Sequence, residues 1–442
     1  MLIGFTAATN LADGVTKIAL PLLAVGLTDS PGLVAGVGLA LTLPWLLASL
    51  HVGVLVDRGD RRRLAALANL VRLAVTLVLL AAVAADRLSL PLLYLAGVLI
   101  GLAEVVANSA VGALIPAAVP RGRLGRVNAW IAGAETVANE FAGPAVGGLL
   151  VGVGAALALG SSAGAFALGA VLLALLAGRF RAHPAGETAE GAAEGTARKA
   201  AGETASFRGT VPSGGAAPRR ERGGTRAELV EGLAFLWRRR LLRTMSLTIA
   251  VLVACWSAWL ALLPSYAVRT LHLGPAGYGL LLGSIGVGGL LGAVLVGAAN
   301  RLLGIRWALF ADLVGTILMM AVPAALPEAW AVGVAAFAGG MGGTLWTVNS
   351  RTLAQLIVPD RLLGRYGAAS RLLSWGTLPV GAGVAGLFAE VAGLRTAFAI
   401  FAVLAALPVV PFLVTVTEGE LAAAQRKSEV DHVILGGIRN NS

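Results

Sequence analysis

Charged residues are scarce in this chain. Only 13% of its 442 residues are charged, whereas 57% are hydrophobic. Soluble domains carry about 25% charged residues, because polar side chains must cover an apolar core. A soluble protein of this composition would expose too much apolar surface to water, so the sequence predicts an all-α integral membrane protein.

Cysteine and histidine are also nearly missing. The single cysteine, Cys255, excludes a disulfide within one chain and a cysteine cluster for a metal ion. The histidines lie far apart and have no ligand spacing. A GxxxxGK[ST] stretch that would bind nucleotide phosphates does not occur, which argues against ATP as the energy source. From the sequence we expect no metal site, no cofactor and no enzymatic activity.

Basic residues outnumber acidic ones, and the formal net charge is +11. Most arginines lie in short loops between apolar runs or in one polar linker. Membrane proteins keep such loops in the cytoplasm, so nucleic-acid binding is not expected. The arginine-rich loops follow the second, fourth, sixth, eighth and tenth apolar runs. This places both termini in the cytoplasm and the protein in the plasma (inner) membrane.

Apolar runs of about 20 residues, the length that crosses a bilayer, recur along the chain. The first lacks the basic start of a cleavable signal peptide. The pattern predicts twelve transmembrane helices in two pseudo-symmetric six-helix bundles. The predicted runs are 2–27, 32–56, 64–85, 90–118, 126–152, 155–178, 242–268, 276–299, 306–325, 329–357, 364–389 and 395–416.

The predicted domain organisation follows from these runs. An N-terminal bundle (1–178) precedes a disordered cytoplasmic linker (179–225), which has few large apolar residues. An amphipathic interfacial helix (226–241) leads to the C-terminal bundle (242–416) and a cytoplasmic tail (417–442). For the amphipathic helix, a place on the membrane surface is favoured over partner binding. The loop 119–126 recurs as 358–365, which indicates a parallel repeat of the two halves.

Ionisable residues at membrane depth are costly and are therefore functional candidates. Asp13 and Lys17 lie one turn apart on the first run, either as a mutually neutralising pair or as contacts for a substrate or coupling ion. A lone carboxyl group in a low-dielectric environment holds a proton more readily than in water, which proton coupling requires. The competing interpretation is that the carboxylates bond neighbouring helices. The further candidates are Glu104, Glu135, Asn139 and Glu140.

The second half offers fewer candidates. Arg351 in the tenth run either reaches the membrane surface or attracts an anionic group. Asp312 is expected to cap the ninth run near the surface. Four aromatic residues are expected either to line an apolar cavity or to contact lipid and its interface, namely Trp256, Trp259, Tyr266 and Trp346.

The fifth run contains Gly143-Pro144-Ala145-Val146-Gly147-Gly148. Pro144 has no N–H, so the carbonyl of Glu140 lacks its helical donor and a kink is predicted. The glycines allow another helix to approach closely. The alternative is a permissive packing face without a further role.

These features together resemble the major facilitator superfamily, and most closely its macrolide-efflux and enterobactin-exporter branch. The loop after the second run is similar to the family's signature loop, although Asp60 stands where many members have glycine. The resemblance implies a cytoplasmic gate in which Asp57 faces the start of the eleventh span. The matching positions are Gly53, Asp57, Arg58, Arg61 and Arg62.

The glycine-rich motif is similar to the core of the family's antiporter signature, with Asn139 in place of an expected glycine. The resemblance implies a secondary transporter that exports a small amphipathic organic molecule, drug-, macrolide- or siderophore-like, in exchange for protons. Its expected partners are that substrate, protons and the lipid bilayer, and a monomer is expected. Two alternatives stay open: an uptake symporter of the same fold, and a non-transporting membrane sensor or assembly protein.

Overall fold

The computed structural model describes residues 2–118, 130–131, 134–175 and 225–420, and the regular structure in these ranges is helical. The described helix ends lie within about one helical turn of the predicted runs, except at the fifth run (126–152), whose first residues lie outside the described residues. Their bounds in the first half are α1 (Leu2–Val25), α2 (Pro31–Arg58), α3 (Arg61–Ala84), α4 (Leu90–Ala118), η2 (Thr136–Ala142), α6 (Gly143–Val153) and α7 (Ala155–Ala174).

In the second half, α9 (Thr225–Arg238) precedes the helices of the predicted C-terminal bundle. These are α10 (Arg240–Arg269), α11 (Pro275–Leu302), α12 (Gly304–Ala325), α13 (Ala329–Ile357), α14 (Asp360–Trp375), α15 (Leu378–Ala392), α16 (Leu394–Ala406) and α17 (Val409–Thr415). The first copy of the repeated loop, the predicted linker up to residue 224 and the tail from residue 421 lie outside the described residues.

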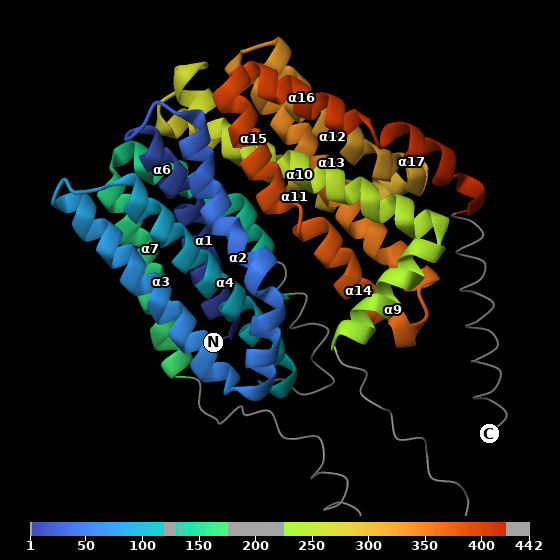
Figure 1. Cartoon of the computed structure of the whole chain (residues 1–442), viewed down its shortest axis with the longest axis horizontal. Coiled ribbons are helices and arrows are strands. Elements are labelled where there is room, and N and C mark those ends of the chain that lie inside the picture. The colour runs from blue at the N-terminus through green and yellow to red at the C-terminus, as the bar shows by residue number, and fades with distance from the viewer. Residues whose placement is uncertain (1, 119–129, 132–133, 176–224, 421–442) are drawn as a thin grey trace, which may run out of the picture.

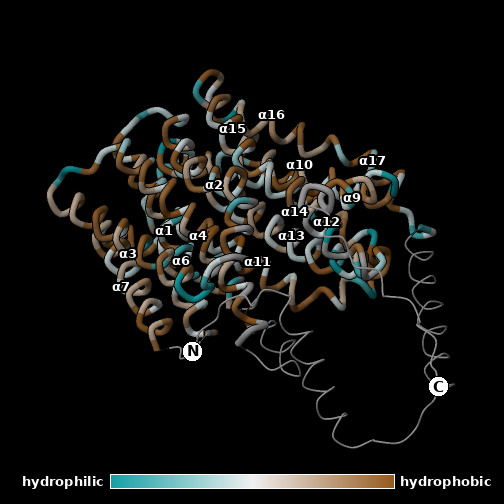
Figure 2. Tube along the Cα trace, turned by 60° about the horizontal axis from the view of Figure 1, so that its bottom comes forward, coloured by the Kyte–Doolittle hydropathy of each residue, from teal (hydrophilic) through white to brown (hydrophobic). Residues whose placement is uncertain are grey.

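Among the described residues, ten helical segments are long and apolar enough to cross a membrane. They cover α2, α3, α4, α7, α10, α11, α12 and α13, and the composite segments α14–α15 and α16–α17. Hydrophobic residues extend along most of these helices, and hydrophilic ones gather mostly at their ends and turns (Figure 2). The chain is therefore a multi-pass membrane protein.

Local sequence explains where α2 and α3 begin. Ser30 caps α2, because its hydroxyl accepts the N–H of Leu33, and Pro31 occupies the first turn. Asp60 caps α3 by accepting the N–H groups of Arg62 and Arg63. The aspartate that departs from the family's signature loop thus has a local structural role.

The predicted proline kink in the fifth run takes a different form. The backbone widens into the π-helix η2 just before Pro144, and the N–H of Gly143 bonds the carbonyl of Ala138, five residues earlier. Pro144 has no N–H and its ring crowds the carbonyl four residues before it. One extra residue in the turn relieves this conflict, and π-helical turns occur frequently at functional sites.

The helices pack into two groups, which we call the first group (α1 to α7) and the second group (α9 to α17) (Figure 1). In the first group, α1 packs on α6 and α7, and α4 packs on α2 and α3. In the second group, α13 packs on α11 and α12, and α10 packs on α15. Clusters of buried hydrophobic residues lie within each group, and one cluster in the second group also includes Ile18 and Leu22 of α1.

Four helices make most of the contact between the groups: α2 packs on α15, and α6 packs on α11. The second contact is backbone against backbone. A Cβ atom on Gly148 would lie 2.2 Å from the Cα of Gly279, so no larger residue fits. On the side facing α1, a Cβ atom on Gly143 would lie 2.7 Å from the Cα of Gly14, and one on Gly147 would lie 3.0 Å from the Cα of Val15. The packing role of the glycine-rich motif is therefore confirmed.

Polar contacts join the groups at the end of the molecule that holds the α1–α2 turn, here called the closed end. The guanidinium of Arg269 donates to the carbonyls of Thr28 and Asp29 and lies 3.3 Å from the Asp29 carboxylate. The Glu390 carboxylate accepts the Ser30 hydroxyl at 2.5 Å and the N–H of Gly32 at 3.1 Å. From here the ribbons of the two groups diverge towards the N terminus and α14 (Figure 1).

Three of the four aromatic residues that were expected at a cavity or a lipid interface lie elsewhere. Trp259 and Tyr266 are fully buried in the core of the second group, and Trp346 is almost fully buried. The Tyr266 hydroxyl donates to the carbonyl of Pro323 at 2.7 Å. Spacing along one helix does not reveal which neighbours cover it. Only Trp256 is partly exposed.

We predict that Arg269→Gln combined with Glu390→Gln loosens the closed end, because both charged groups bond the opposite group. Spin labels on Leu27→Cys and Val391→Cys, in a Cys255→Ala background, report the separation by pulsed electron paramagnetic resonance. The double variant should show a longer and broader distance distribution.

The matched control is Arg395→Gln, since Arg395 donates to the carbonyl of Ala324 within the second group. It should leave the distance distribution as it is in the parent protein. A double variant that is indistinguishable from this control would contradict the role of the polar contacts.

Candidate functional site

Two ion pairs connect α1 to its neighbours in the first group. The Arg72 guanidinium on α3 lies 2.5 Å from Oδ2 of Asp13, and the Lys17 ammonium lies 2.9 Å from Oε1 of Glu104 on α4. Since Asp13 and Lys17 are one helical turn apart, the pairs are neighbours. The first pair is buried, with exposures of 4% and 2%, whereas the Lys17 side chain is 39% exposed.

These partners exclude the interpretation of Asp13 and Lys17 as a mutually neutralising pair. Each has an opposite charge on another helix, so the two do not serve only to neutralise each other. Glu104 was treated as a lone carboxylate, and this was wrong, because Lys17 is its counter-ion. The burial of two charges of each sign in a bilayer is tolerable because they are paired.

An amide chain extends the Lys17–Glu104 pair to the π-helix. The Lys17 ammonium donates to Oδ1 of Asn139 at 3.4 Å, and Nδ2 of Asn139 donates to Oδ1 of Asn10 at 3.3 Å. Asn10 in turn donates to the carbonyl of Thr6. Glycine, the residue that the family pattern has at position 139, would provide none of these bonds. The departure from the pattern therefore joins η2 to the charged site.

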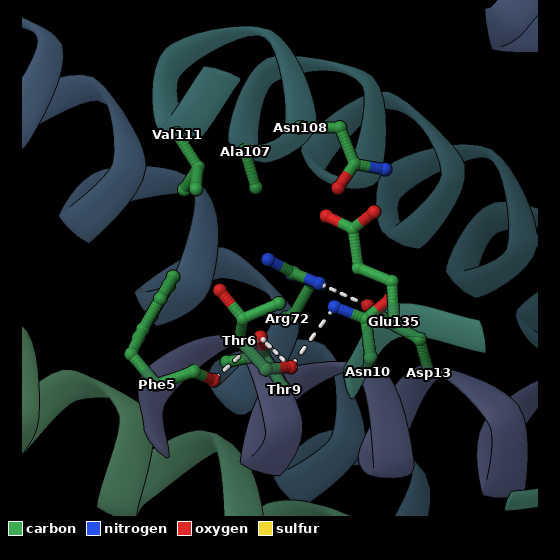
Figure 3. Close-up of a pocket in the computed structure, with 10 residues that line it drawn as sticks. All are labelled: Phe5, Thr6, Thr9, Asn10, Asp13, Arg72, Ala107, Asn108, Val111 and Glu135. Atoms are coloured by element: carbon green, nitrogen blue, oxygen red, sulfur yellow. Dashed lines mark hydrogen bonds and ion pairs between the residues drawn. The ribbon is translucent and has the colours of Figure 1, made fainter. Parts of the chain in front are cut away.

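A small pocket opens beside the buried pair (Figure 3). The Glu135 side chain extends into it from the segment before η2, with its carboxylate towards Asn108. Glu135 and Asp13, far apart in sequence, thus face the same space. The residues that line the pocket are Phe5, Thr6, Thr9, Asn10, Asp13, Arg72, Ala107, Asn108, Val111 and Glu135.

The buried pair has spare hydrogen-bonding capacity. Oδ1 of Asp13 and Nε of Arg72 are buried and have no hydrogen-bond partner among the described residues. An unsatisfied buried polar atom costs about 1–3 kcal/mol, so such atoms usually have a purpose. The Arg72 guanidinium is also held over the Phe166 ring, 5.1 Å from its centroid. Both orphan atoms belong to residues that line the pocket, so a polar ligand group that donates to Oδ1 of Asp13 and accepts from the Nε–H of Arg72 can satisfy them.

Arg72 is the main residue that sequence reasoning missed. The run 64–85 was judged by its length and hydrophobicity, and one arginine did not interrupt it. The rule applied to Asp13 and Glu104, that ionisable residues at membrane depth are functional candidates, also applies to Arg72. Asn10 and Asn108 gave a weaker signal, because a single amide in an apolar helix is often only a helix–helix contact.

Other predicted residues do not join this site. Arg351 is exposed on α13. Gly53 has open space beside it, since a Cβ atom at this position would have no neighbour within 4 Å. Arg62 donates to the carbonyls of Leu173 and Ala174, which fastens α3 to the end of α7. Arg61 is partly buried at the start of α3. The side chains of Asp57, Arg58 and Glu140 lie outside the described residues.

Asp312 is not a surface cap, as the sequence suggested. It is 4% exposed and lies two turns inside α12, which begins at Gly304. Its carboxylate is hydrogen-bonded to the Thr316 hydroxyl, and Gly342 of α13 packs against its backbone. The second group therefore buries a carboxyl group in its own core, apart from the pairs on α1.

The two ion pairs differ in how deeply they are buried. Asp13–Arg72 is buried and fixes α1 against α3. The Lys17–Glu104 pair has a partly exposed ammonium, so its partners can separate at lower cost.

Comparisons with known proteins agree with the fold. The sequence matches the model of the Major Facilitator Superfamily over residues 2–374. The crystal structure of the nucleoside transporter NupG superposes with a TM-score of 0.65 at 11% identity, covering 94% of this chain and 98% of that one. No curated protein sequence matches.

A bacterial homologue of the iron transporter ferroportin is similar in two conformations, at 17% identity in each. Its inward-facing state gives a TM-score of 0.64 and covers 93% of this chain and 96% of that one. Its outward-facing state gives 0.56, with 93% and 97% covered. At these identities the similarity concerns the fold.

We predict that Arg72→Met destabilises the protein by about 3–5 kcal/mol, because it strands the Asp13 carboxylate without its counter-ion. Asp13→Leu should have a comparable cost. The double variant should recover most of the loss, since an apolar pair of similar volume carries no desolvation penalty. Unfolding of the purified protein in detergent, followed by circular dichroism, measures all three.

Arg63→Gln serves as the control, because the Arg63 side chain is 81% exposed and its ion pair with Asp60 lies at the surface, where it contributes little. Costs that simply add in the double variant would show that Asp13 and Arg72 do not depend on each other.

Proposed function

This chain belongs to the major facilitator superfamily, and we propose that it exports a small amphipathic organic molecule in exchange for protons, by alternating access. In this proposal α1 and the segment η2–α6 are spans too, which completes twelve membrane helices. The two groups are the six-helix bundles of residues 1–178 and 242–416. The substrate site lies between them.

The conformation is proposed to be inward-facing. The arginine-rich loops favour the cytoplasm, so the closed end, which carries Arg269, Glu390 and the α1–α2 turn, faces outwards. The polar contacts at this end then form an outer gate. The greater similarity to the inward-facing state of the ferroportin homologue supports the same assignment.

The observation that carries the proposal is the Lys17–Glu104 pair and its link to the group interface. From Lys17 the contacts run through Asn139 of η2 to α6, where Gly148 packs against Gly279 of the second group. A proton on Glu104 releases Lys17 and weakens its bond to Asn139. The π-helix, with its poorer hydrogen-bond geometry, is the element that can then rearrange and shift α6 against α11.

Coupling follows if proton and substrate compete for this pair. A proton can shift the populations of the two states only as far as its affinity differs between them. In the proposal the outward-facing state binds the proton at Glu104, and the inward-facing state exchanges it for the substrate. Glu135 is proposed to relay protons through the pocket, because its side chain extends into the pocket that Asp13 and Arg72 also line.

The substrate class is proposed from the resemblance: an amphipathic molecule that is drug-, macrolide- or siderophore-like. On the cytoplasmic side, the loop 53–62 is proposed to be the inner gate, with Asp57 as its acidic latch against the start of α14. Asp57 would be favoured there by the helix dipole.

We predict that Glu104→Gln uncouples export from the proton gradient, because glutamine keeps the shape and hydrogen bonding of the site but holds no proton. Inverted membrane vesicles with an imposed proton gradient, supplied with erythromycin, ethidium or a catecholate siderophore, measure accumulation. Gradient-driven accumulation should fall by about tenfold or more. Exchange of labelled for unlabelled compound, without a gradient, should persist.

Glu328→Gln is the matched control, since Glu328 is an exposed acid before α13. Unchanged gradient dependence in Glu104→Gln would remove this residue from the mechanism and direct the test to Glu135 and Glu140. Accumulation of the compound when the gradient drives protons into the vesicles would establish the uptake symporter instead, because compound and protons would then move in the same direction. Binding without flux for every compound in the panel would establish the sensor.

A further inference from the structure

The helix α9 has two faces of different character. One face packs on α14: Leu236 is fully buried there, and a Cβ on Gly232 would lie 2.3 Å from the carbonyl oxygen of Arg365. The Glu231 carboxylate forms an ion pair with the Arg365 guanidinium. The start of α14 is therefore attached to α9 both by backbone packing and by charge.

The other face of α9 is apolar and exposed. Val230, Leu233 and Trp237 are 65%, 41% and 48% exposed. Their spacing of three and four residues places them in one stripe along the helix. A water-facing helix would not normally present large apolar side chains at three consecutive turns. This stripe needs a cover that the described part of the chain does not provide.

Basic residues continue directly from the apolar stripe. Arg238, Arg239 and Arg240 are all exposed, and Arg239 lies over the Phe235 ring. The acid on this part of α9, Glu231, already has Arg365 as its partner. Because the membrane segment α10 begins at Arg240, the three arginines lie at the boundary between bilayer and water.

We propose that α9 lies on the bilayer surface, with Val230, Leu233 and Trp237 among the acyl chains and Arg238 to Arg240 bound to the phosphates of anionic lipids. An apolar stripe bordered by arginines and a tryptophan is the pattern that binds such a surface. The charge complementarity selects anionic lipid over a zwitterionic one. A water-soluble protein partner could cover the apolar stripe, but it would not explain why three arginines adjoin the stripe at the boundary between bilayer and water.

Lipid docking would also restrain α14. That helix leads through Trp375 into α15, which carries the Glu390 contact of the closed end. A lipid-bound α9 thus holds the opposite end of the same composite helix. The docking itself does not rest on the proposed transport function, and its test needs no substrate.

The full-length protein is tested with Trp237→Cys in a Cys255→Ala background, labelled with an environment-sensitive fluorophore. The vesicles contain phosphatidylcholine alone or a mixture with phosphatidylglycerol. With phosphatidylglycerol, the emission should shift to the blue, and lipids spin-labelled near the headgroup should quench it. The same label on Glu420→Cys, an exposed residue beyond α17, should show neither effect.

The triple variant Arg238→Gln, Arg239→Gln and Arg240→Gln should abolish the preference for phosphatidylglycerol. Each arginine near an anionic surface is worth about a fivefold change in the ratio of docked to undocked helix. The charge-matched control replaces three exposed arginines on other elements by glutamine, namely Arg63, Arg87 and Arg301, and should behave as the parent does.

Three results would overturn the proposal. The first is a label that stays in water in both vesicle types. The second is equal docking in both types with no effect of the triple variant, which would leave anionic lipid without a role. The third is shielding of the label only after cytosolic protein is added, which would assign the face to a protein partner.

Discussion

The first group depends on the pairing of charges that α1 brings into the interior of its helix packing. Asp13 and Lys17 lie one turn apart and each binds a partner on a different helix, Arg72 on α3 and Glu104 on α4. An isolated charge at this depth would be prohibitively costly, so these four residues fix the mutual rotation of three helices. The same dependence makes the pairs responsive: any event that neutralises one member changes what its partner binds. Structure and proposed coupling thus rest on one arrangement.

The site is connected to the group interface by unusual backbone rather than by long side chains. Asn139 links Lys17 to η2, and the following glycines bring α6 against α1 on one side and α11 on the other. A π-helix that ends at a proline is a natural place for a change in helix geometry. The second group differs, because its buried carboxyl group, that of Asp312, is enclosed between α12 and α13. The two halves share an architecture but divide the chemistry unequally.

Much of the fold was predictable because a bilayer imposes simple rules. Hydrophobic length gave the helices to within about one turn, and turn residues such as Ser30 and Asp60 explain where helices start. Pairing between helices was not predictable, because one sequence does not state which faces meet. Asp13 and Lys17 were found, but Arg72 was passed over and Glu104 was taken as unpartnered. Trp259 and Tyr266 were misplaced for the same reason. The π-helix follows from Pro144 only once its neighbours are known.

In the proposed mechanism, Glu104 exchanges its bond with Lys17 for a proton. Infrared difference spectroscopy of the reconstituted protein across a pH titration observes this directly, through the carbonyl stretch of a protonated carboxyl group. We predict a carbonyl band that grows as the pH falls, disappears in Glu104→Gln and persists in Glu328→Gln. Addition of a transported compound should diminish that band. A band that is identical in Glu104→Gln and the parent protein would contradict the claim.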